Sequence, residues 1–338
     1  MLRIVYAGSP EISSVPLKGL LEDGSHRIVA VLTNPPSSKG RHGALVPTPV
    51  ETVAREFCAQ NQLDEEPLIL TPEHLDASVR EKIAALKPDI LVCFAYGKIF
   101  GPKFMELFPM GGINLHPSLL PKYRGCAPVP ASILNMDKTT GFTIQRVAQE
   151  MDSGNILLQT CFNIEESDNS QTILDRAANE GSKLFLEVLN KLEKCKKEGT
   201  EFPDEHEQDS SKATYCGFLE KEDGKIDWNE SAEKINAKIR AFYPWPGAFT
   251  SLDGTMLKIH RATVVTDSCA KEVLGLPENQ QDFVSGKVLG KDKRFGIFVQ
   301  TGNGILALQN LQLQGKKAME WADFLNGNQS FIGKICGK

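Results

Sequence analysis

The chain has 338 residues, of which 41% are hydrophobic and 24% are charged, and its formal net charge is −5 at pH 7. This length is enough for two domains, each with a core of its own, and the composition is typical of soluble globular proteins. No apolar run approaches the roughly 18 residues of a membrane-spanning helix. The N-terminal residues enter a predicted strand at once, without a signal or transit peptide. We therefore expect a cytoplasmic protein without a membrane anchor.

The eight cysteines are scattered and form no Cys-x-x-Cys pair. This pattern predicts neither a zinc site nor a disulfide framework, and it favours a reducing compartment with mostly buried, inert thiols. Cys126 lies beside the loop with the strongest functional signal. Since the sequence positions no base to activate its thiol, we expect Cys126 to serve packing rather than act as a nucleophile.

Short β-rich runs alternate with helical stretches in the first half of the chain. This rhythm predicts a Rossmann-like, mainly parallel sheet with helices on both faces. A long amphipathic helix would close this domain. The expected strands are 4–7, 27–32, 90–94, 112–116 and 141–147, and the expected helices cover 16–21, 49–60 and 172–192.

The second half has a different character. A polar stretch with Pro203 and the acidic run 204–209 reads as a linker, which divides the chain into domains at 1–193 and 212–338, with the linker at 194–211. The second domain should hold a helix at 232–241 and short glycine-containing strands, which suggests a small antiparallel β-barrel (OB-like) or sandwich. From residue 211 onward, about 17 Lys and Arg stand against about 14 Asp and Glu, a mild basic bias. The expected strands are 256–263, 286–289, 296–300 and 304–312.

The strongest functional signal is the run 112–125. Alternate side chains of a strand share a face, so Asn114 and His116 point together, roughly 7 Å apart. Pro117 stops the strand directly after them. Ligands of open α/β sheets bind beyond the carboxyl ends of strands. A histidine satisfied by the backbone of the core is the alternative for His116, but its position at a strand end beside Asn114 favours a functional site.

Asp152 follows another apolar strand, within the sequence Glu-Met-Asp-Ser-Gly. If that strand ends at the same edge of the sheet, Asp152 converges on Asn114 and His116, where a carboxylate raises the pKa of an imidazole and can accept a proton. A carboxylate before Ser-Gly is also a common turn former or helix cap. From these residues alone, both interpretations stay open.

Three further segments carry weaker signals. Gly8 is the only glycine of a dinucleotide fingerprint in the first loop, so NAD binding is not expected. The long loop 34–43 holds Lys39, Arg41 and His42, which suits either a phosphate-bearing partner or a solvated loop. The segment 242–248 places aromatic residues between prolines, as an interdomain plug or a stacking platform, and we favour the plug.

Taken together, these motifs resemble the folate-dependent formyltransferase family, along nearly the full length of the chain, and within it the tRNA-directed branch. The Asn-x-His…Asp set is specific to folate-dependent formyl transfer, and the Pro-Trp-Pro segment and the closing Gly-Lys-Lys point to the tRNA branch. The quoted matches are residues 7–11, 95–98, 114–121, 124–125, 152, 226–228, 240–248 and 311–317, with the basic loop around Arg41.

The resemblance implies that the chain transfers the formyl group of 10-formyltetrahydrofolate to the α-amine of methionine on initiator tRNA. It implies that the Asn114 amide and a protonated His116 stabilise the oxyanion, while Asp152 keeps His116 protonated and accepts the proton of the amine, through water. No metal is expected, and we expect a monomer. The implied folate-site residues are Phe94, Ala95, Tyr96, Ser118, Leu119, Leu120 and Pro121, and the implied tRNA-binding residues are Lys39, Arg41 and His42.

Three other functions stay open at this point. The acceptor could be a small amine, such as an amino sugar or glycinamide ribonucleotide, although a second domain with a basic bias favours tRNA. Water could be the acceptor, which gives hydrolysis of the formyl folate. The chain could also bind folate or RNA without catalysis, against which the intact Asn114, His116 and Asp152 argue.

Overall fold

The computed structural model describes residues 1–38, 43–61, 66–275 and 284–337. The chain divides into two compact units. The first comprises Met1–Pro128, Thr139–Asn163 and Leu174–Cys216, and the second comprises Val129–Lys138, Ile164–Ile173 and Gly217–Lys338. No helix within the described ranges is long and apolar enough to cross a membrane.

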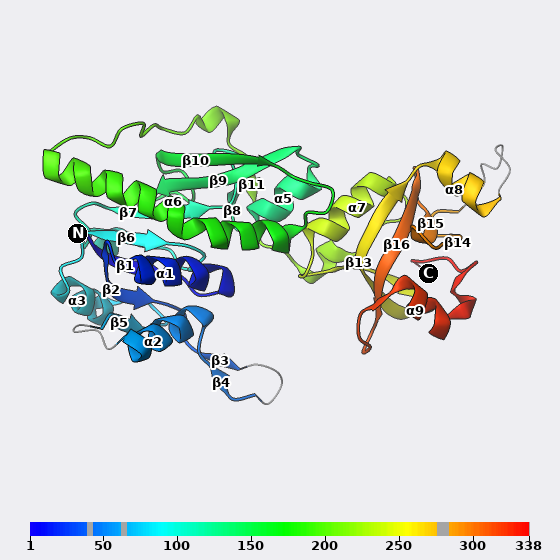
Figure 1. The fold of residues 1–338 in the computed structure, drawn as a ribbon, viewed down its shortest axis with the longest axis horizontal. Helices are drawn as coiled ribbons and strands as arrows, with labels where there is room; N and C mark the ends of the chain where they lie inside the picture. Colours follow the sequence, from blue (N-terminus) through cyan, green and yellow to red (C-terminus); the bar gives the residue numbers. More distant parts are fainter. Residues whose placement is uncertain (39–42, 62–65, 276–283, 338) are drawn as a thin grey trace. The chain divides into compact units, whose positions relative to one another are not determined.

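The first unit holds the mainly parallel sheet (Figure 1). Its strands are β1 (Arg3–Ala7), β2 (Arg27–Leu32), β3 (Ser37–Ser38), β4 (Leu45–Val46), β5 (Leu68–Leu70), β6 (Ile90–Cys93), β7 (Gly112–His116), β8 (Arg124–Gly125), β9 (Thr139–Arg146), β10 (Ile156–Asn163) and β11 (Tyr215–Cys216). Its helices are α1 (Glu11–Asp23), α2 (Pro49–Asn61), α3 (Ala77–Ala85), α4 (Pro102–Met105) and most of α6 (Ser170–Glu198).

The main sheet has seven strands in the order β10-β9-β7-β6-β1-β2-β5. The pairs from β7 to β5 are parallel, whereas β9 and β10 add an antiparallel edge. Strands β1 and β6 are buried almost throughout, as expected for the centre of a sheet that helices cover on both faces. The Rossmann-like fold predicted from the sequence is confirmed.

The packing of α6 fixes the direction of the side chains on β7. A Cβ added to Gly181 of α6 would lie 2.8 Å from Pro16 of α1 and 3.5 Å from Leu115 of β7, so α1, α6 and Leu115 meet on one face. Since strand side chains alternate, Asn114 and His116 point to the opposite face. Helices α3 and α4 pack on that opposite face, in the hydrophobic cluster that contains residues of β1, β2 and β6.

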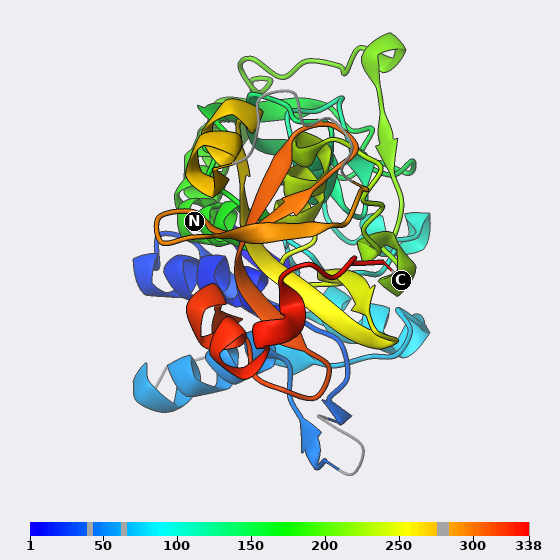
Figure 2. The ribbon, with the colours of Figure 1, turned by 90° about the vertical axis from the view of Figure 1, so that its right-hand side faces the viewer.

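The second unit is built around a six-stranded antiparallel sheet, in the order β12-β13-β16-β15-β14 with β17 beside β16. Figure 2 shows its yellow and orange strands between the gold α8 and the red α9. The predicted antiparallel, strand-rich second half is confirmed. Its elements are α5 (Pro128–Leu134), α7 (Ala232–Ala241), β12 (Ala248–Leu252), β13 (Thr255–Val265), α8 (Asp267–Leu274), β14 (Val288–Asp292), β15 (Gly296–Gln300), β16 (Ile305–Leu313), β17 (Met319–Glu320) and α9 (Trp321–Gly327).

The core of the second unit explains two of its sequence motifs. Trp228 is buried and donates from Nε1 to Thr250 Oγ1 at 3.0 Å, which ties the segment before α7 to β12. Phe242, directly after α7, is also buried. Trp245 is 58% exposed, so the indole of the Pro-Trp-Pro segment does not fill the interior of its own unit.

The division into domains at 193 and 211 stays a prediction. Helix α6 continues to Glu198, which lies five residues past the predicted end of the first domain. The segment from there to Cys216 packs with the first unit, and its contacts with the candidate site are described below.

Candidate active site

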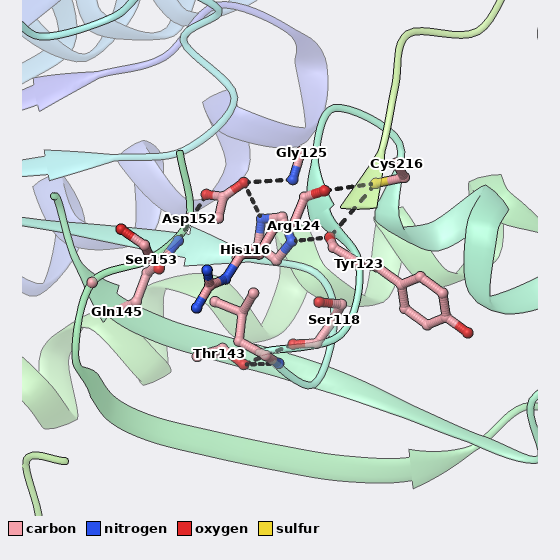
Figure 3. A network of polar contacts seen from close by, with 12 residues as sticks. His116, Ser118, Tyr123, Arg124, Gly125, Thr143, Gln145, Asp152, Ser153 and Cys216 are labelled. Carbon is pink, nitrogen blue, oxygen red and sulfur yellow. Dashed lines mark hydrogen bonds and ion pairs between the residues drawn. The ribbon is translucent and has the colours of Figure 1, made fainter. Parts of the chain in front are cut away.

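His116 lies at the end of β7 and is only 4% exposed. Its Nε2 is 2.8 Å from the carbonyl oxygen of Tyr123, in the loop that follows the strand. Its Nδ1 is 3.5 Å from Oδ2 of Asp152 (Figure 3). One ring nitrogen is thus satisfied by a backbone carbonyl, as expected for a structural histidine in the core. The other ring nitrogen faces a carboxylate, as expected for a functional site.

Asp152 reaches His116 from the loop between β9 and β10. Its backbone is in the left-handed region, with φ 53°. Oδ1 accepts a hydrogen bond from Nε2 of Gln145 at 2.8 Å, and Oδ2 accepts one from the backbone N–H of Gly125 at 2.8 Å. The carboxylate is therefore held on both oxygens and presents Oδ2 to the imidazole of His116 (Figure 3). The expected convergence is found, but not for the expected reason: β9 runs antiparallel to β7 and ends beside the start of β7, so the loop after it folds back to bring Asp152 to His116.

Burial and the neighbouring oxygen atoms act in opposite directions on the pKa of His116. Burial lowers the pKa of the imidazole below its ordinary value of 6.5, although Asp152 and the carbonyl of Tyr123 act in the opposite direction. The neutral ring carries its proton on Nε2, because the carbonyl oxygen of Tyr123 can only accept. Nδ1 then presents a lone pair. A lowered pKa favours the neutral ring in the free protein at neutral pH, whereas the two oxygen atoms that face its nitrogens favour the protonated ring that the resemblance implied.

Asn114 sits beside this pair. On β7 it is opposite Gln145 of the antiparallel strand β9, and directly opposed residues of such a pair project their side chains to the same face. Asn114 is half-buried, and within the described part of the chain its side-chain amide has no hydrogen-bond partner. A free amide next to His116 and Asp152 can donate to a bound ligand.

The predicted folate-site residues after β6 contribute backbone rather than aromatic surface. Phe94 and Tyr96 are each 2% exposed, and the ring of Tyr96 stacks on that of Phe100 with centroids 5.5 Å apart. Ala95 is exposed, with φ 50°, and Gly97 has open space around it. Ala95 and Gly97 are thus the exposed residues of the segment 94–97, and a ligand can reach them.

The loop after β7 divides its predicted folate-site residues into two kinds. Ser118 is fully buried and donates from Oγ to the carbonyl of Lys122 at 2.7 Å. Leu120 is 3% exposed, and its backbone N–H is 3.3 Å from Oγ1 of Thr143. These two residues build the loop, whereas Leu119 and Pro121 are half-buried and accessible to a ligand.

The predicted tRNA-binding residues Lys39, Arg41 and His42 lie outside the described residues. The segments on either side of them form a two-stranded antiparallel ribbon, in which Ser37 pairs with Val46 and Ser38 with Leu45. Both short strands are exposed.

Cys126 is exposed, which corrects the expectation that it serves packing, and only half of the eight thiols are buried. Partial burial, together with the nearby charge of Asp152, raises the pKa of the Cys126 thiol above its ordinary value of 9.0. A thiol with a raised pKa is a poor nucleophile at neutral pH.

Among the described residues, no group of three or more His, Cys, Asp and Glu side chains is arranged to hold a metal ion.

Two glutamines at the site were not predicted. Gln145 binds the carboxylate of Asp152, and Gln208 binds the backbone of the same loop. A weak sequence signal existed for Gln145, because Thr143 and Gln145 are polar at alternate positions and so share one face of the strand. Gln208 lies in a polar stretch in which nothing distinguishes it from its neighbours.

The fold and the site define a formyl transferase. The chain belongs to this family: residues 2–189 match the model "Formyl transferase", and residues 219–329 match "Formyl transferase, C-terminal domain". It is 44% identical over 331 residues to the methionyl-tRNA formyltransferase of Treponema denticola, with 98% of each chain covered. These matches confirm the predicted family and enzyme class, and they favour the tRNA-directed branch over small-amine acceptors.

Solved structures support the fold. The methionyl-tRNA formyltransferase from Clostridium thermocellum superposes with a TM-score of 0.51 at 17% identity, over 78% of this chain and 94% of that one. HypX from Aquifex aeolicus, in complex with tetrahydrofolic acid, superposes with a TM-score of 0.59 at 14% identity, over 98% of this chain and 48% of that one.

Proposed function

We propose that this chain transfers the formyl group of 10-formyltetrahydrofolate to the α-amine of methionine esterified to initiator tRNA, as a monomer and without a metal ion. One observation carries the proposal: Asp152 meets His116 at the carboxyl end of β7, beside Asn114, whose side-chain amide has no partner among the residues that the structure describes. The near full-length similarity to a methionyl-tRNA formyltransferase supports the choice of acceptor.

In the proposed reaction, the amine attacks the formyl carbon and negative charge develops on the formyl oxygen. The Asn114 amide donates to this oxygen, and one such donor is typically worth about 3 kcal/mol of transition-state stabilisation. The amine loses a proton, and His116 is suited to receive it because Nδ1 carries a lone pair in the neutral ring. The C–N bond to the folate then breaks, and its nitrogen takes up a proton.

Asp152 has a defined role in this scheme. When His116 gains a proton at Nδ1, the ring becomes positively charged next to Oδ2 of Asp152, which stabilises the imidazolium. The carboxylate does not need to move, since Gln145 and Gly125 already hold it. The pair thus stores the proton until the folate nitrogen leaves.

We propose that the folate binds against the peptide groups around Ala95 and Gly97 and against Leu119 and Pro121. The accessible backbone after β6 supports this position, because pterin-like rings need several hydrogen-bond partners in a fixed arrangement. The side chains of Phe94, Tyr96, Ser118 and Leu120 act indirectly, by shaping the two loops.

The proposed tRNA contacts come from the loop of residues 39–42, with Arg41 toward the acceptor stem, and from the second unit, with its mild basic bias. Arg41→Ala should lose formylation of tRNA far more than affinity for folate. Equal losses of the two would contradict the assigned role of Arg41.

The direct test is to incubate the purified chain with 10-formyltetrahydrofolate and charged initiator tRNA and to analyse the released amino acid by mass spectrometry. A mass gain of one formyl group on methionine supports the proposal. Consumption of the formyl folate without tRNA would identify hydrolysis instead, and formylation of an amino sugar or glycinamide ribonucleotide would identify the small-amine alternative. Asn114→Ala, His116→Ala and Asp152→Ala should each lose most of the activity.

A further inference from the structure

We propose that Gln208 is a positioning residue of the active site: together with Gln145 and Arg124 it fixes the orientation and the electrostatic environment of the Asp152 carboxylate. The inference rests on the proposed function only in that it assigns Asp152 to formyl transfer. Gln208 lies beyond α6, in the stretch predicted as a linker, 56 residues from Asp152 in the sequence.

The contacts of Gln208 leave a single orientation for its amide. Oε1 accepts from Nε and Nη2 of Arg124, at 3.0 and 2.8 Å. Nε2 donates to the carbonyl oxygens of Asp152 and Gly154, at 2.8 and 2.7 Å. Since a guanidinium can only donate and a carbonyl oxygen can only accept, a flipped amide would lose every one of these bonds.

Gln145 links Gln208 to the carboxylate of Asp152. Its Nε2 donates to Oδ1 of Asp152 at 2.8 Å, so its Oε1 must point the other way, and Oε1 lies 3.3 Å from Nε2 of Gln208. Arg124, Gln208 and Gln145 thus lie in order toward the carboxylate. The contact between the two amides is the longest of the series, because the two N–H groups of Gln208 lie closer to the carbonyls of Asp152 and Gly154. We call Arg124, Gln208 and Gln145 the amide relay.

Two of the three members of the amide relay are buried, and Gln208 is half-buried. Arg124 is 3% exposed and Gln145 is 2% exposed, so their hydrogen bonds have little competition from water. The guanidinium of arginine keeps its proton at any working pH, which fixes the start of the relay. Asp152 Oδ1 is thus held by a donor at all times, and Oδ2 is left to face His116.

Gln208 also holds the backbone that carries Asp152. A non-glycine residue with positive φ costs of order 1–3 kcal/mol and needs surrounding contacts to keep it there. Asp152 has φ 53°, and Gln208 binds the carbonyl of Asp152 and that of Gly154, two residues later. One side chain thus restrains both the strained turn and, through Gln145, the carboxylate.

Gln208→Glu is the most informative substitution. It preserves size and keeps an acceptor for Arg124, but it turns the Nε2 donor into an oxygen that faces three oxygen acceptors. We expect kcat for formyl transfer to fall by about 100-fold and KM for 10-formyltetrahydrofolate to stay within about threefold. The thermal unfolding midpoint should also fall, because the loop of Asp152 loses the hydrogen bonds that restrain it. Unchanged kcat, or a loss confined to KM, would overturn the proposal.

Gln60→Glu is the control for the change of an amide into a carboxylate, because Gln60 lies on α2 in the first unit and its side chain is exposed. This variant should keep its activity. A loss equal to that of Gln208→Glu would mean that such a change disturbs the protein wherever it is made, and would also overturn the proposal.

Gln145→Glu gives a second, independent measurement. It places a carboxylate against Oδ1 of Asp152, and like charges at this distance raise the pKa of one of them. The acidic limb of the kcat–pH profile should therefore move to higher pH, by about one unit. An unmoved profile would contradict an electrostatic role for the relay. If the unmodified chain does not formylate methionyl-tRNA at all, the proposed function fails instead, which is a distinguishable result.

Discussion

The imidazole of His116 is anchored to the carbonyl oxygen of Tyr123, with Nε2 2.8 Å from that oxygen. Nε2 is therefore already used as a donor within the protein. The nitrogen that remains for chemistry is Nδ1, which faces Asp152. This arrangement makes His116 an acceptor of protons when it is neutral, and it leaves Asn114 as the amide donor nearest to the developing charge.

The free amide of Asn114 gives the first prediction. Asn114→Ala should lower kcat by about 100- to 1000-fold, because it removes one donor to the formyl oxygen in the transition state. The free energy of unfolding should change little, since the side chain is half-buried and has no partner in the described part of the chain. Steady-state kinetics and urea denaturation measure the two quantities.

Asn61→Ala serves as the control for this variant, because Asn61 is exposed and its side-chain amide donates to the carbonyl of Phe57 in its own helix. It should leave the kinetics unchanged. An Asn114→Ala enzyme that turns over at the normal rate would remove Asn114 from the mechanism.

The neutral state of His116 predicts a dependence of stability on pH. Burial holds the pKa of His116 below 6.5, so as the pH falls below that value the unfolded chain binds a proton that the folded chain does not bind. Folding is therefore penalised on the acid side. The difference in the free energy of unfolding between the unmodified chain and His116→Asn should shrink from pH 7.5 to pH 5.

Urea denaturation at the two pH values measures this difference. His26 is the necessary comparison, because burial also lowers its pKa, and its effect has the same sign. The shrinkage should persist when both proteins carry His26→Asn. A difference that stays constant or grows toward pH 5 would show that His116 is not neutral in the folded chain.

We expect that a side chain at Gly125 would lower both the stability of the protein and its formyl-transfer activity. The φ of Gly125 is +114°, and an added Cβ would lie 2.1 Å from the carbonyl oxygen of Cys216. Gly125→Ala must therefore displace β8 from β11 and move the N–H that holds Asp152. We expect a loss of about 1–3 kcal/mol in the free energy of unfolding and a large loss of kcat.

Gly101→Ala is the matched control, because its φ is −71° and no atom lies within 4 Å of an added Cβ. It should be nearly neutral in both denaturation and kinetic measurements. If Gly125→Ala were also nearly neutral, the close approach of β8 to β11 would not be needed for stability or activity.

We expect that substitution of Cys126 has little effect on activity. Its thiol is exposed and its raised pKa keeps it protonated at neutral pH, so it takes no part in the proposed reaction. Cys126→Ser should keep kcat/KM for tRNA formylation within about twofold of the unmodified enzyme. A loss greater than tenfold would indicate that the thiol contacts a substrate.

Much of the site could be predicted from local sequence. The limits of β7 follow from its apolar residues and from Pro117, and they place Asn114 and His116 on one face. The approach of Asp152 to His116 does not follow from strand ends, because β9 runs antiparallel to β7 and its last residue, Arg146, lies opposite Ile113 near the start of β7. It depends on the loop after β9 folding back toward His116, which only the tertiary structure shows.

Other features of the site depend on contacts between distant residues. The neutral state of His116 results from its burial, which no local pattern encodes. The role of Gln208 depends on a polar segment returning to the loop of Asp152 after a 29-residue helix. A glutamine in such a segment resembles any solvated residue, so its function becomes visible only when its partners are known.

The return of residues 204–216 to the candidate site has a practical consequence for protein engineering. Gln208 binds the loop of Asp152, and β11 (Tyr215–Cys216) pairs with β8. A fragment that stops at residue 193 would lack both supports and should be a poor catalyst even if it is produced in soluble form. A chimaera that exchanges the acceptor-recognition module with that of another enzyme should accordingly be joined after Cys216.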